Sequence, residues 1–114
     1  MCTGSQARRL REAPALIPAT SDHITVIAET FRLLGDPTRL RVLLACLEGP
    51  IAVGDIAKAV DASQSLVSHH LRLLRAARLV RGTRKMRQIF YEAADDHIRH
   101  MLIGMIEHVR EDEA

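Results

Sequence analysis

Apolar side chains recur at helical spacing along much of this chain. Between residues 21 and 34 they fall three or four positions apart, which predicts an amphipathic helix that ends at Gly35. The pair Asp36-Pro37 predicts the start of a second helix, because Asp caps helix N-termini and Pro is tolerated at the first helical position. We expect Gly49-Pro50 to stop this helix. Its buried stripe is predicted to hold Leu40, Leu43, Leu44 and Leu47.

Two short helices, two strands and a last helix are predicted further along the chain. The first two helices are separated by a turn at Asp61-Ala62, and Ser63 caps the second of them. A change to strand-like spacing then predicts a hairpin whose loop, 84–87, is basic. The predicted bounds are 54–60, 64–77, 79–83, 88–92 and 95–110. We expect residues 1–20 to form a flexible N-terminal arm and 21–114 to form one domain.

Length and composition narrow the class of protein. A chain of 114 residues with 47% hydrophobic residues fits one domain with its own core. It has no apolar run near the roughly 18 residues of a membrane span. Two cysteines without an export signal favour a cytoplasmic protein over a disulfide framework. Only 3% of residues are aromatic, which argues against a protein that stacks on single-stranded bases.

Charge is divided unevenly along the chain, although the net charge is only +2. Residues 63–91 contain seven basic residues and no acidic one, whereas residues 92–114 contain seven acidic and two basic residues. This division favours a basic half that binds a polyanion, beside an acidic half with a different function. The alternative is that both halves simply present solvated faces.

The two helices around the turn at 61–62 form a helix-turn-helix arrangement. On a helical wheel, Leu66, Val67, His70, Leu71 and Leu74 share one face of the second helix, and its polar residues share the other. We expect the apolar face to pack on the domain, with His70 as a core histidine. Short polar side chains at the start of such a helix suit base edges, and arginines suit phosphates. A generic amphipathic helix with a basic face is the alternative. The candidate DNA-contact residues are Gln64, Ser65, Ser68, His69, Arg72 and, on the hairpin, Arg84, Lys85 and Arg87.

The last predicted helix carries side chains of the kinds that bind metal ions. On a wheel, His97 and His108 share one stripe with Glu111 and His100. His97 and His108 lie roughly 16 Å apart along the axis, so one helix cannot hold one ion with both. Two antiparallel copies would bring Asp95 and His97 of one chain to His108 and Glu111 of the other, giving two sites per dimer. The alternative is a dimer helix with surface histidines.

Two stretches of the sequence resemble a known family. They are 34–41, Leu-Gly-Asp-Pro-Thr-Arg-Leu-Arg, and 65–71, Ser-Leu-Val-Ser-His-His-Leu, and they look like the signatures of ArsR/SmtB winged-helix repressors. The resemblance implies a mainly α fold with a small β-hairpin, a winged helix-turn-helix that dimerises through terminal helices. It also implies a bacterial repressor that releases operator DNA when an effector binds.

The resemblance extends to the candidate metal ligands. Asp-x-His, followed after ten residues by His-x-x-Glu, looks like the C-terminal-helix zinc site of the family, which carries Asp95, His97, His108 and Glu111 over as ligands. The family's thiol site near the third helix has no counterpart, because residues 52–55 are Ala-Val-Gly-Asp.

The resulting expectation is a cytoplasmic metal-responsive repressor and not an enzyme. Its partners are double-stranded operator DNA and a second copy, with no membrane and no small organic ligand. Zn(II) is the expected effector, with Co(II), Ni(II) and Cd(II) as alternatives. A repressor with a thiol or redox signal through Cys2 and Cys46 is the alternative function, although we expect Cys46 to be a core residue. His23, His100, Cys2 or the N-terminus remain possible additional ligands.

Overall fold

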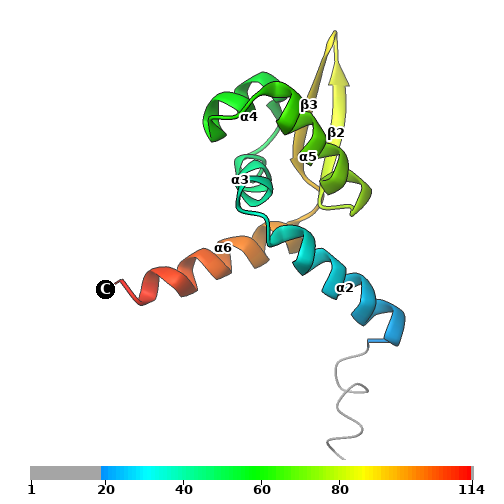
Figure 1. The fold of residues 1–114 in the computed structure, drawn as a ribbon, viewed down its shortest axis with the longest axis vertical. Helices are drawn as coiled ribbons and strands as arrows, with labels where there is room; N and C mark the ends of the chain where they lie inside the picture. The colour runs from blue at the N-terminus through cyan, green and yellow to red at the C-terminus, as the bar shows by residue number, and fades with distance from the viewer. Residues whose placement is uncertain (1–18, 114) are drawn as a thin grey trace, which may run out of the picture. The chain divides into compact units, whose positions relative to one another are not determined.

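The computed structural model describes residues 19–113. The chain divides between Arg32 and Leu33 into two compact units. Helix α2, Ser21–Leu34, makes up most of the described part of the first unit, and the remaining elements belong to the second (Figure 1). Among the described residues, no helix is long and apolar enough to cross a membrane. The elements of the second unit are α3 (Pro37–Ala45), β1 (Ile51–Ala52), α4 (Val53–Val60), α5 (Gln64–Ala76), β2 (Val80–Lys85), β3 (Gln88–Ala93) and α6 (Asp96–Glu111).

Side-chain caps start most of these helices where the sequence predicts. In each case a side-chain oxygen accepts a hydrogen bond from a backbone N–H in the first turn, where no intrahelical partner exists. This confirms the predicted starts at Asp36 and Ser63 and assigns Asp95 as the cap of the last helix. The bonds are Arg39 N to Asp36 Oδ1 (2.9 Å), Leu66 N to Ser63 Oγ (3.1 Å), Ile98 N to Asp95 Oδ1 (3.0 Å) and His23 N to Thr20 Oγ1 (3.1 Å).

The turn between α4 and α5 has the predicted position. Asp61 adopts a left-handed conformation with φ 54°, and its backbone N–H bonds to carbonyls of the last turn of α4. Aspartate tolerates this region of backbone space better than most residues. The chain can therefore reverse within three residues, and α4 and α5 form the expected helix-turn-helix.

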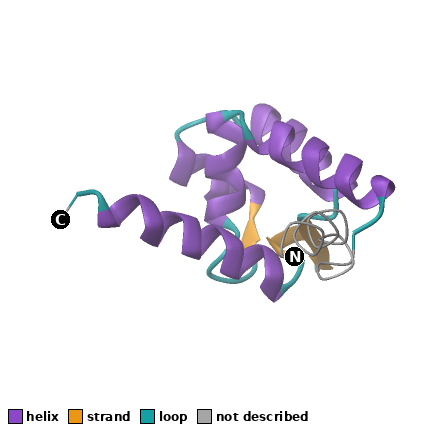
Figure 2. Ribbon diagram, turned by 90° about the horizontal axis from the view of Figure 1, so that it is seen from below, coloured by secondary structure: helices purple, strands orange, loops and turns teal. Residues whose placement is uncertain are grey.

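A small antiparallel sheet follows α5, with the strand order β1-β3-β2. Figure 2 shows that the strands occupy a small part of this otherwise helical unit. Lys85 pairs with Gln88, so only Met86 and Arg87 form the turn of the hairpin. The prediction of a four-residue basic loop is therefore wrong, because the strand pairing continues through Arg84 and Lys85. The sequence analysis also missed β1, whose Ile51 and Ala52 pair with β3.

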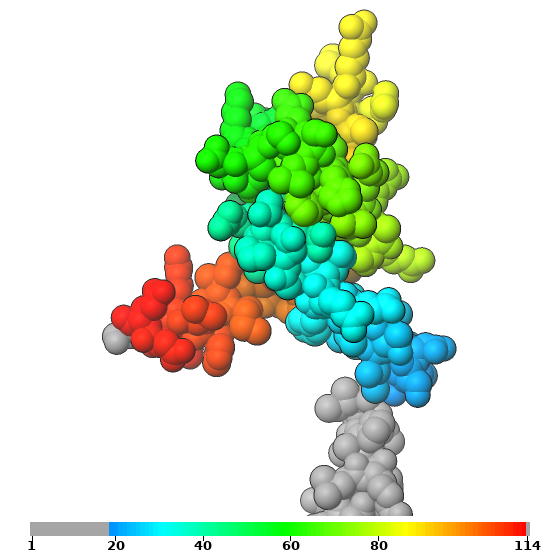
Figure 3. Space-filling model, viewed as in Figure 1, coloured from blue at the N-terminus to red at the C-terminus, as the bar shows by residue number. Residues whose placement is uncertain are grey.

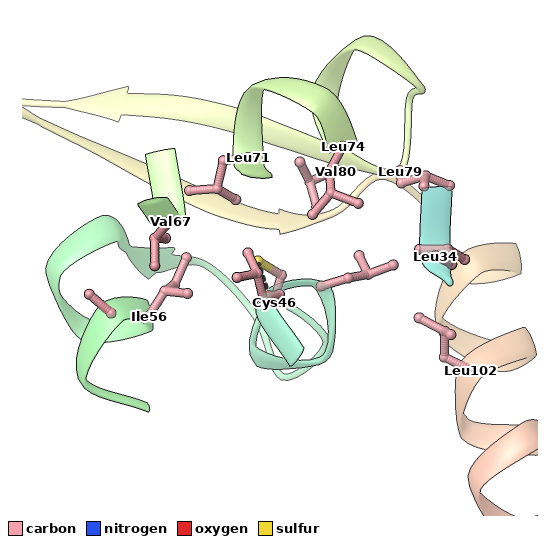
Figure 4. Packing of buried hydrophobic residues seen from close by; sticks show 12 residues of the cluster. Leu34, Cys46, Ile56, Val67, Leu71, Leu74, Leu79, Val80 and Leu102 are labelled. Atoms are coloured by element: carbon pink, nitrogen blue, oxygen red, sulfur yellow. Dashed lines mark hydrogen bonds between the residues drawn. The ribbon is translucent and has the colours of Figure 1, made fainter. Parts of the chain in front are cut away.

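The core of the second unit lies between α3, α4, α5 and the sheet. Figure 4 shows Val67, Leu71 and Leu74 of α5 directed toward Ile56 and Cys46. The predicted leucine stripe of α3 is only partly correct, because Val42 and Leu43 are fully buried whereas the other three leucines are partly exposed. Leu66 is also exposed, contrary to prediction. The buried stripe of α5 is narrower than expected and consists of Val67, His70, Leu71 and Leu74.

Candidate functional site

The exposed face of α5 carries most of the polar side chains that we predicted to contact DNA. Gln64 and Ser65 lie in its first turn, directly after the Ser63 cap, and are exposed together with His69 and Arg72. Ser68 is partly buried. No acidic side chain stands in the first turn of α5 to repel an approaching phosphate. The helix therefore presents hydrogen-bonding groups near its positive N-terminal end and cationic groups behind them.

The hairpin of β2 and β3 extends this basic surface. Arg84, Lys85 and Arg87 are all exposed, and the hairpin lies beside α5 on the face seen in Figure 3. Met86 at its tip is 96% exposed and has a positive φ of 58°. The exposed face of α5 and the tip of the hairpin are thus cationic, which suits a polyanion.

His70 is the buried member of a histidine pair on α5. Its side chain is 5% exposed, and its Nδ1 atom has no hydrogen-bond partner among the described residues. Burial lowers the pKa of His70, and the positive charge of Arg39 lowers it further. The prediction that His70 belongs to the core is confirmed, while His69 is exposed on the outer face.

The candidate metal ligands lie at the two ends of α6. Asp95 caps the helix, and its Oδ1 atom lies 3.6 Å from Nδ1 of His97, whose side chain is 96% exposed. His108 and Glu111 are exposed three residues apart near the other end. Within the described part of the chain, no three His, Cys, Asp or Glu side chains converge on a common point. One chain therefore holds two separate pairs of candidate ligands, as the helical spacing requires.

Other candidate ligands have plainer roles where the structure describes them. The Nδ1 atom of His23 accepts a hydrogen bond from Thr20 N (3.1 Å), so this histidine helps to cap α2. His100 is exposed on α6. Cys46 is fully buried, as predicted, and burial raises its thiol pKa to about 12. Cys2 and the predicted arm up to residue 18 lie outside the described residues.

Two apolar surfaces remain exposed to solvent. In the second unit, α3 and α6 enclose an open groove of about 520 Å³ whose apolar lining is Leu40, Leu44, Leu102, Met105, Ile106 and Val109. In the first unit, Ile24, Ile27 and Phe31 of α2 are about half exposed, and they repeat at helical spacing. Soluble proteins rarely leave such stripes uncovered, so both surfaces are candidate interfaces.

Comparison with known proteins identifies the family. A family profile described as "Bacterial regulatory protein, arsR family" matches residues 36–81. A transcriptional repressor SmtB homolog of Synechocystis sp. is 39% identical over 90 residues, which cover 79% of this chain and 68% of that protein. The chain belongs to the ArsR family of bacterial regulatory proteins. Because the relatives are transcriptional regulators, transcription regulation is the general role of this chain as well.

Further relatives support the same assignment. The HTH-type transcriptional regulator NmtR of Mycobacterium tuberculosis is 40% identical over 91 residues, or 80% of this chain and 76% of NmtR. A solution structure of apo-NmtR superposes with a TM-score of 0.69 at 38% identity over 82% of this chain and 79% of that one. The structure of the cadmium metal-sensor CMTR from Mycobacterium tuberculosis superposes with a TM-score of 0.62 at 39% identity. This match covers 72% of this chain and 85% of that one. These matches confirm the winged helix-turn-helix fold.

The family match and the candidate ligands occupy different parts of the chain. Residues 36–81 run from the cap of α3 to the start of β2, and they include the helix-turn-helix but not α6. The ligand set therefore depends on the residues of α6 themselves. Sequence reasoning missed one polar residue there. Arg99 on α6 forms a hydrogen bond with the end of α3. Arg99 is one of only two Lys or Arg residues after Tyr91, but its partner is a backbone carbonyl, so the residue types did not reveal this bond.

Proposed function

We propose that this chain is a metal-responsive transcriptional repressor that binds operator DNA as a homodimer and releases it when a divalent ion, Zn(II) in the first place, binds between the C-terminal helices. The observation that carries this proposal is the pair of ligand clusters at opposite ends of α6. Each cluster holds one exposed imidazole and one carboxylate. Relatives with related sequences include a protein described as a cadmium metal-sensor.

The donor set fits a zinc-like ion. Asp95 and His97 of one chain, with His108 and Glu111 of a second copy, supply two nitrogen and two oxygen donors, which is a complete four-coordinate set. Oδ1 of Asp95 accepts the capping bond from Ile98 N, and the other carboxylate oxygen is left to bind the ion. The bound ion would act as a bridge between the chains. Metal ions bind imidazole in its neutral form, so protons compete with the ion for these ligands.

The apolar surfaces support a second copy of this chain as the partner. The groove between α3 and α6 runs along the same helix that carries the ligand clusters. Covering it with a second α6 would remove exposed Met105, Ile106 and Val109 from water. Gly104, near the midpoint of the two clusters, has open space where a Cβ atom would lie, so it permits close approach of another helix.

The DNA half of the proposal rests on α5 and the hairpin. In a two-fold dimer, the two copies of α5 would enter successive major grooves about 34 Å apart. Gln64, Ser65 and Ser68 would then face base edges, and His69 would lie beside them. The cations Arg72, Arg84, Lys85 and Arg87 would contact phosphates, so operator affinity should fall steeply with salt.

Cobalt titration and a complementation experiment test the metal site. Reduced apoprotein titrated with Co(II) should bind one ion per chain, with intense d–d bands and no thiolate charge-transfer band. His97→Ala and His108→Ala should each abolish this signal, whereas the matched control His100→Ala, exposed on the same helix, should keep it. A thiolate band would instead involve Cys2 or Cys46 and overturn the ligand set.

Mixing the two inactive variants decides whether the site is shared between chains. A heterodimer of His97→Ala and His108→Ala chains contains one intact site, because each chain supplies the pair that the other lacks. The mixture should therefore regain Co(II) binding at up to one ion per heterodimer. If it regains none while both variants remain folded dimers, the intersubunit arrangement is refuted.

A DNA-binding assay tests the response. A duplex selected by the apoprotein from a random pool serves as the operator, and its dissociation constant is measured by fluorescence anisotropy with and without Zn(II). Allosteric coupling of typical size, about 1–3 kcal/mol, predicts weakening of about 5–150-fold. Equal affinity at saturating Zn(II), Co(II), Ni(II) and Cd(II) would refute the metal-responsive function.

A further inference from the structure

The end of α3, here Cys46 and Leu47 directly after the helix, accepts two hydrogen bonds, one from α6 and one from the last residue of β3. Nε of Arg99 donates a hydrogen bond to the Leu47 carbonyl oxygen at 3.2 Å, although the two residues are 52 positions apart. The backbone N–H of Ala93, the last residue of β3, donates to the Cys46 carbonyl at 3.0 Å. Cys46 is the C-cap of α3, and Leu47 follows it outside the helix. Arg99 thus donates to a part-buried backbone carbonyl in the turn that follows α3.

Arg99 shares a helical turn with the proposed ligands but lies on the opposite side of it. Its backbone N–H donates to the Asp95 carbonyl at 3.4 Å, so the two residues close one turn. At 100° per residue, Arg99 lies about 200° from His97 around the helix. His97 is almost fully exposed, whereas Arg99 is partly buried. In this turn, the proposed ligand His97 therefore faces solvent, whereas Arg99 faces the interior of the unit.

The end of α3 is in turn packed against α5. Cys46 is fully buried in the same cluster as Val67, Leu71 and Leu74, which form the inner face of α5 (Figure 4). Closely packed elements of this kind shift as units, because a dense core transmits displacement and compresses little. A movement of the α3 end would consequently change the position of the helix that is proposed to contact bases.

An open space beside the hydrogen bond of Arg99 to Leu47 leaves room for such a movement. A hollow of about 320 Å³ lies at the junction of α3, the base of the hairpin and α6. Its polar lining includes Asp95, Asp96, Arg99 and the ion pair of Arg81 and Glu92, whose atoms lie 3.5 Å apart. A first turn of α6 that moves toward a second copy would therefore slide along a wet, polar space and would not have to compress the core.

We propose that Arg99 is a positioning residue that couples ion binding at Asp95 and His97 to the position of α5, through its hydrogen bond to the Leu47 carbonyl. This inference rests on the proposed function, since it assigns a route for that regulation. When Asp95 and His97 are drawn toward a second copy, Arg99 pulls on the end of α3 through this hydrogen bond. The displacement of the α3 end moves α5 away from its DNA-binding position.

The test compares Arg99→Ala with Arg41→Ala. Arg41 is an exposed arginine of α3, outside the proposed ligand and DNA-contact sets. This control therefore removes the same charge but leaves the hydrogen bond between Arg99 and Leu47 intact. Three quantities are measured for each protein: Co(II) affinity, operator affinity of the apoprotein and operator affinity with saturating Zn(II). The control and the wild type should show weakening of about 5–150-fold by Zn(II). Arg99→Ala should keep the first two quantities and reduce this response below about fivefold.

The outcomes separate this inference from the proposed function. If the wild type binds no Co(II), or shows no response to Zn(II), the proposed function fails. If the wild type responds and Arg99→Ala responds equally, only the role of Arg99 is refuted. Loss of Co(II) binding or of apo operator binding in a folded Arg99→Ala protein would also refute it, because Arg99 would then be a structural residue.

Two further measurements keep the inference testable if Arg99→Ala does not fold. Arg99→Lys retains a donor at the same place, so it should restore part of the Zn(II) response. In ¹⁵N spectra of the wild type, the hydrogen-bonded Arg99 Nε–H should give a slowly exchanging signal that changes when Zn(II) is added. An Arg99 signal that Zn(II) leaves unaltered would overturn the inference without any variant.

Discussion

Mild acid should destabilise this protein through His70. This side chain is 5% exposed on the inner face of α5, and its Nδ1 atom lacks a partner among the described residues. Burial is the main reason for its lowered pKa. The charge of Arg39 and the neighbouring His69 act in the same direction, and Asp36 opposes them. The perturbation is a change from about pH 7.5 to about pH 5.5, a range in which histidine is the main side chain to titrate.

The sign and size of the effect follow from linkage. The unfolded chain protonates His70 near its ordinary pKa of 6.5, whereas the folded chain resists protonation until a lower pH. As the pH falls through 6.5, the unfolded state thus binds more protons and the free energy of unfolding decreases. The loss reaches about 1.4 kcal/mol at most over these two pH units. It stops growing once the pH falls below the folded-state pKa.

Guanidinium unfolding measures this loss at a fixed protein concentration and with a chelator present. His70→Gln keeps a polar side chain of similar size but removes the titration, so its stability should depend less on pH. The control is His69→Gln, because His69 is the exposed neighbour of His70 and this variant should behave as the wild type does. If wild type and His70→Gln lose the same free energy between the two pH values, the reasoning is refuted.

Three further predictions concern Cys46, Ser63 and Gly82. In a Cys2→Ser background, Cys46 should react with iodoacetamide at pH 8 only after unfolding, because the native thiol is buried with a pKa raised to about 12; rapid labelling of the native protein would contradict this. Ser63→Ala removes the cap of α5 and should lower the free energy of unfolding by about 0.5–2 kcal/mol in a denaturant titration, whereas an unchanged midpoint would show that the cap contributes nothing. Gly82→Ala places a Cβ atom 3.0 Å from Cε1 of Tyr91 and 3.2 Å from Cγ2 of Ile89, so it should cost about 1–3 kcal/mol by the same assay, and a stable variant would mean that the hairpin adjusts freely.

Helix starts were predictable from the sequence because their signals are local. Asp36-Pro37 and Ser63 each place a side-chain oxygen where it accepts a first-turn N–H, and this needs no distant partner. The reversal at Asp61-Ala62 was predictable for the same reason. The family motifs lie in this same stretch, which explains why the helix-turn-helix was the most secure part of the prediction.

The features that sequence reasoning missed depend on distant contacts. Strand β1 has only two residues, too few for an alternating pattern, and it forms because β3 offers an unpaired edge. The burial of Val42 in place of a full leucine stripe depends on packing within a core cluster that other elements contribute to. Arg99 has the same character, since its partner lies 52 residues away and is a backbone carbonyl. Every residue has a backbone carbonyl, so the residue types do not show which carbonyl will accept such a bond.

The candidate metal site also combines features that are local in the sequence with a feature that is not. The pair of His108 and Glu111 is local, because residues three apart share a helix face, and so is the pair of Asp95 and His97. What joins the pairs is neither local nor within one chain, because roughly 16 Å of helix separates them. Each pair alone offers two donors, fewer than an ion of this type requires. In the proposed intersubunit site, ion binding is therefore thermodynamically linked to dimerisation: diluting the apoprotein should weaken apparent Co(II) affinity, and saturating Co(II) should tighten the dimer by the corresponding factor.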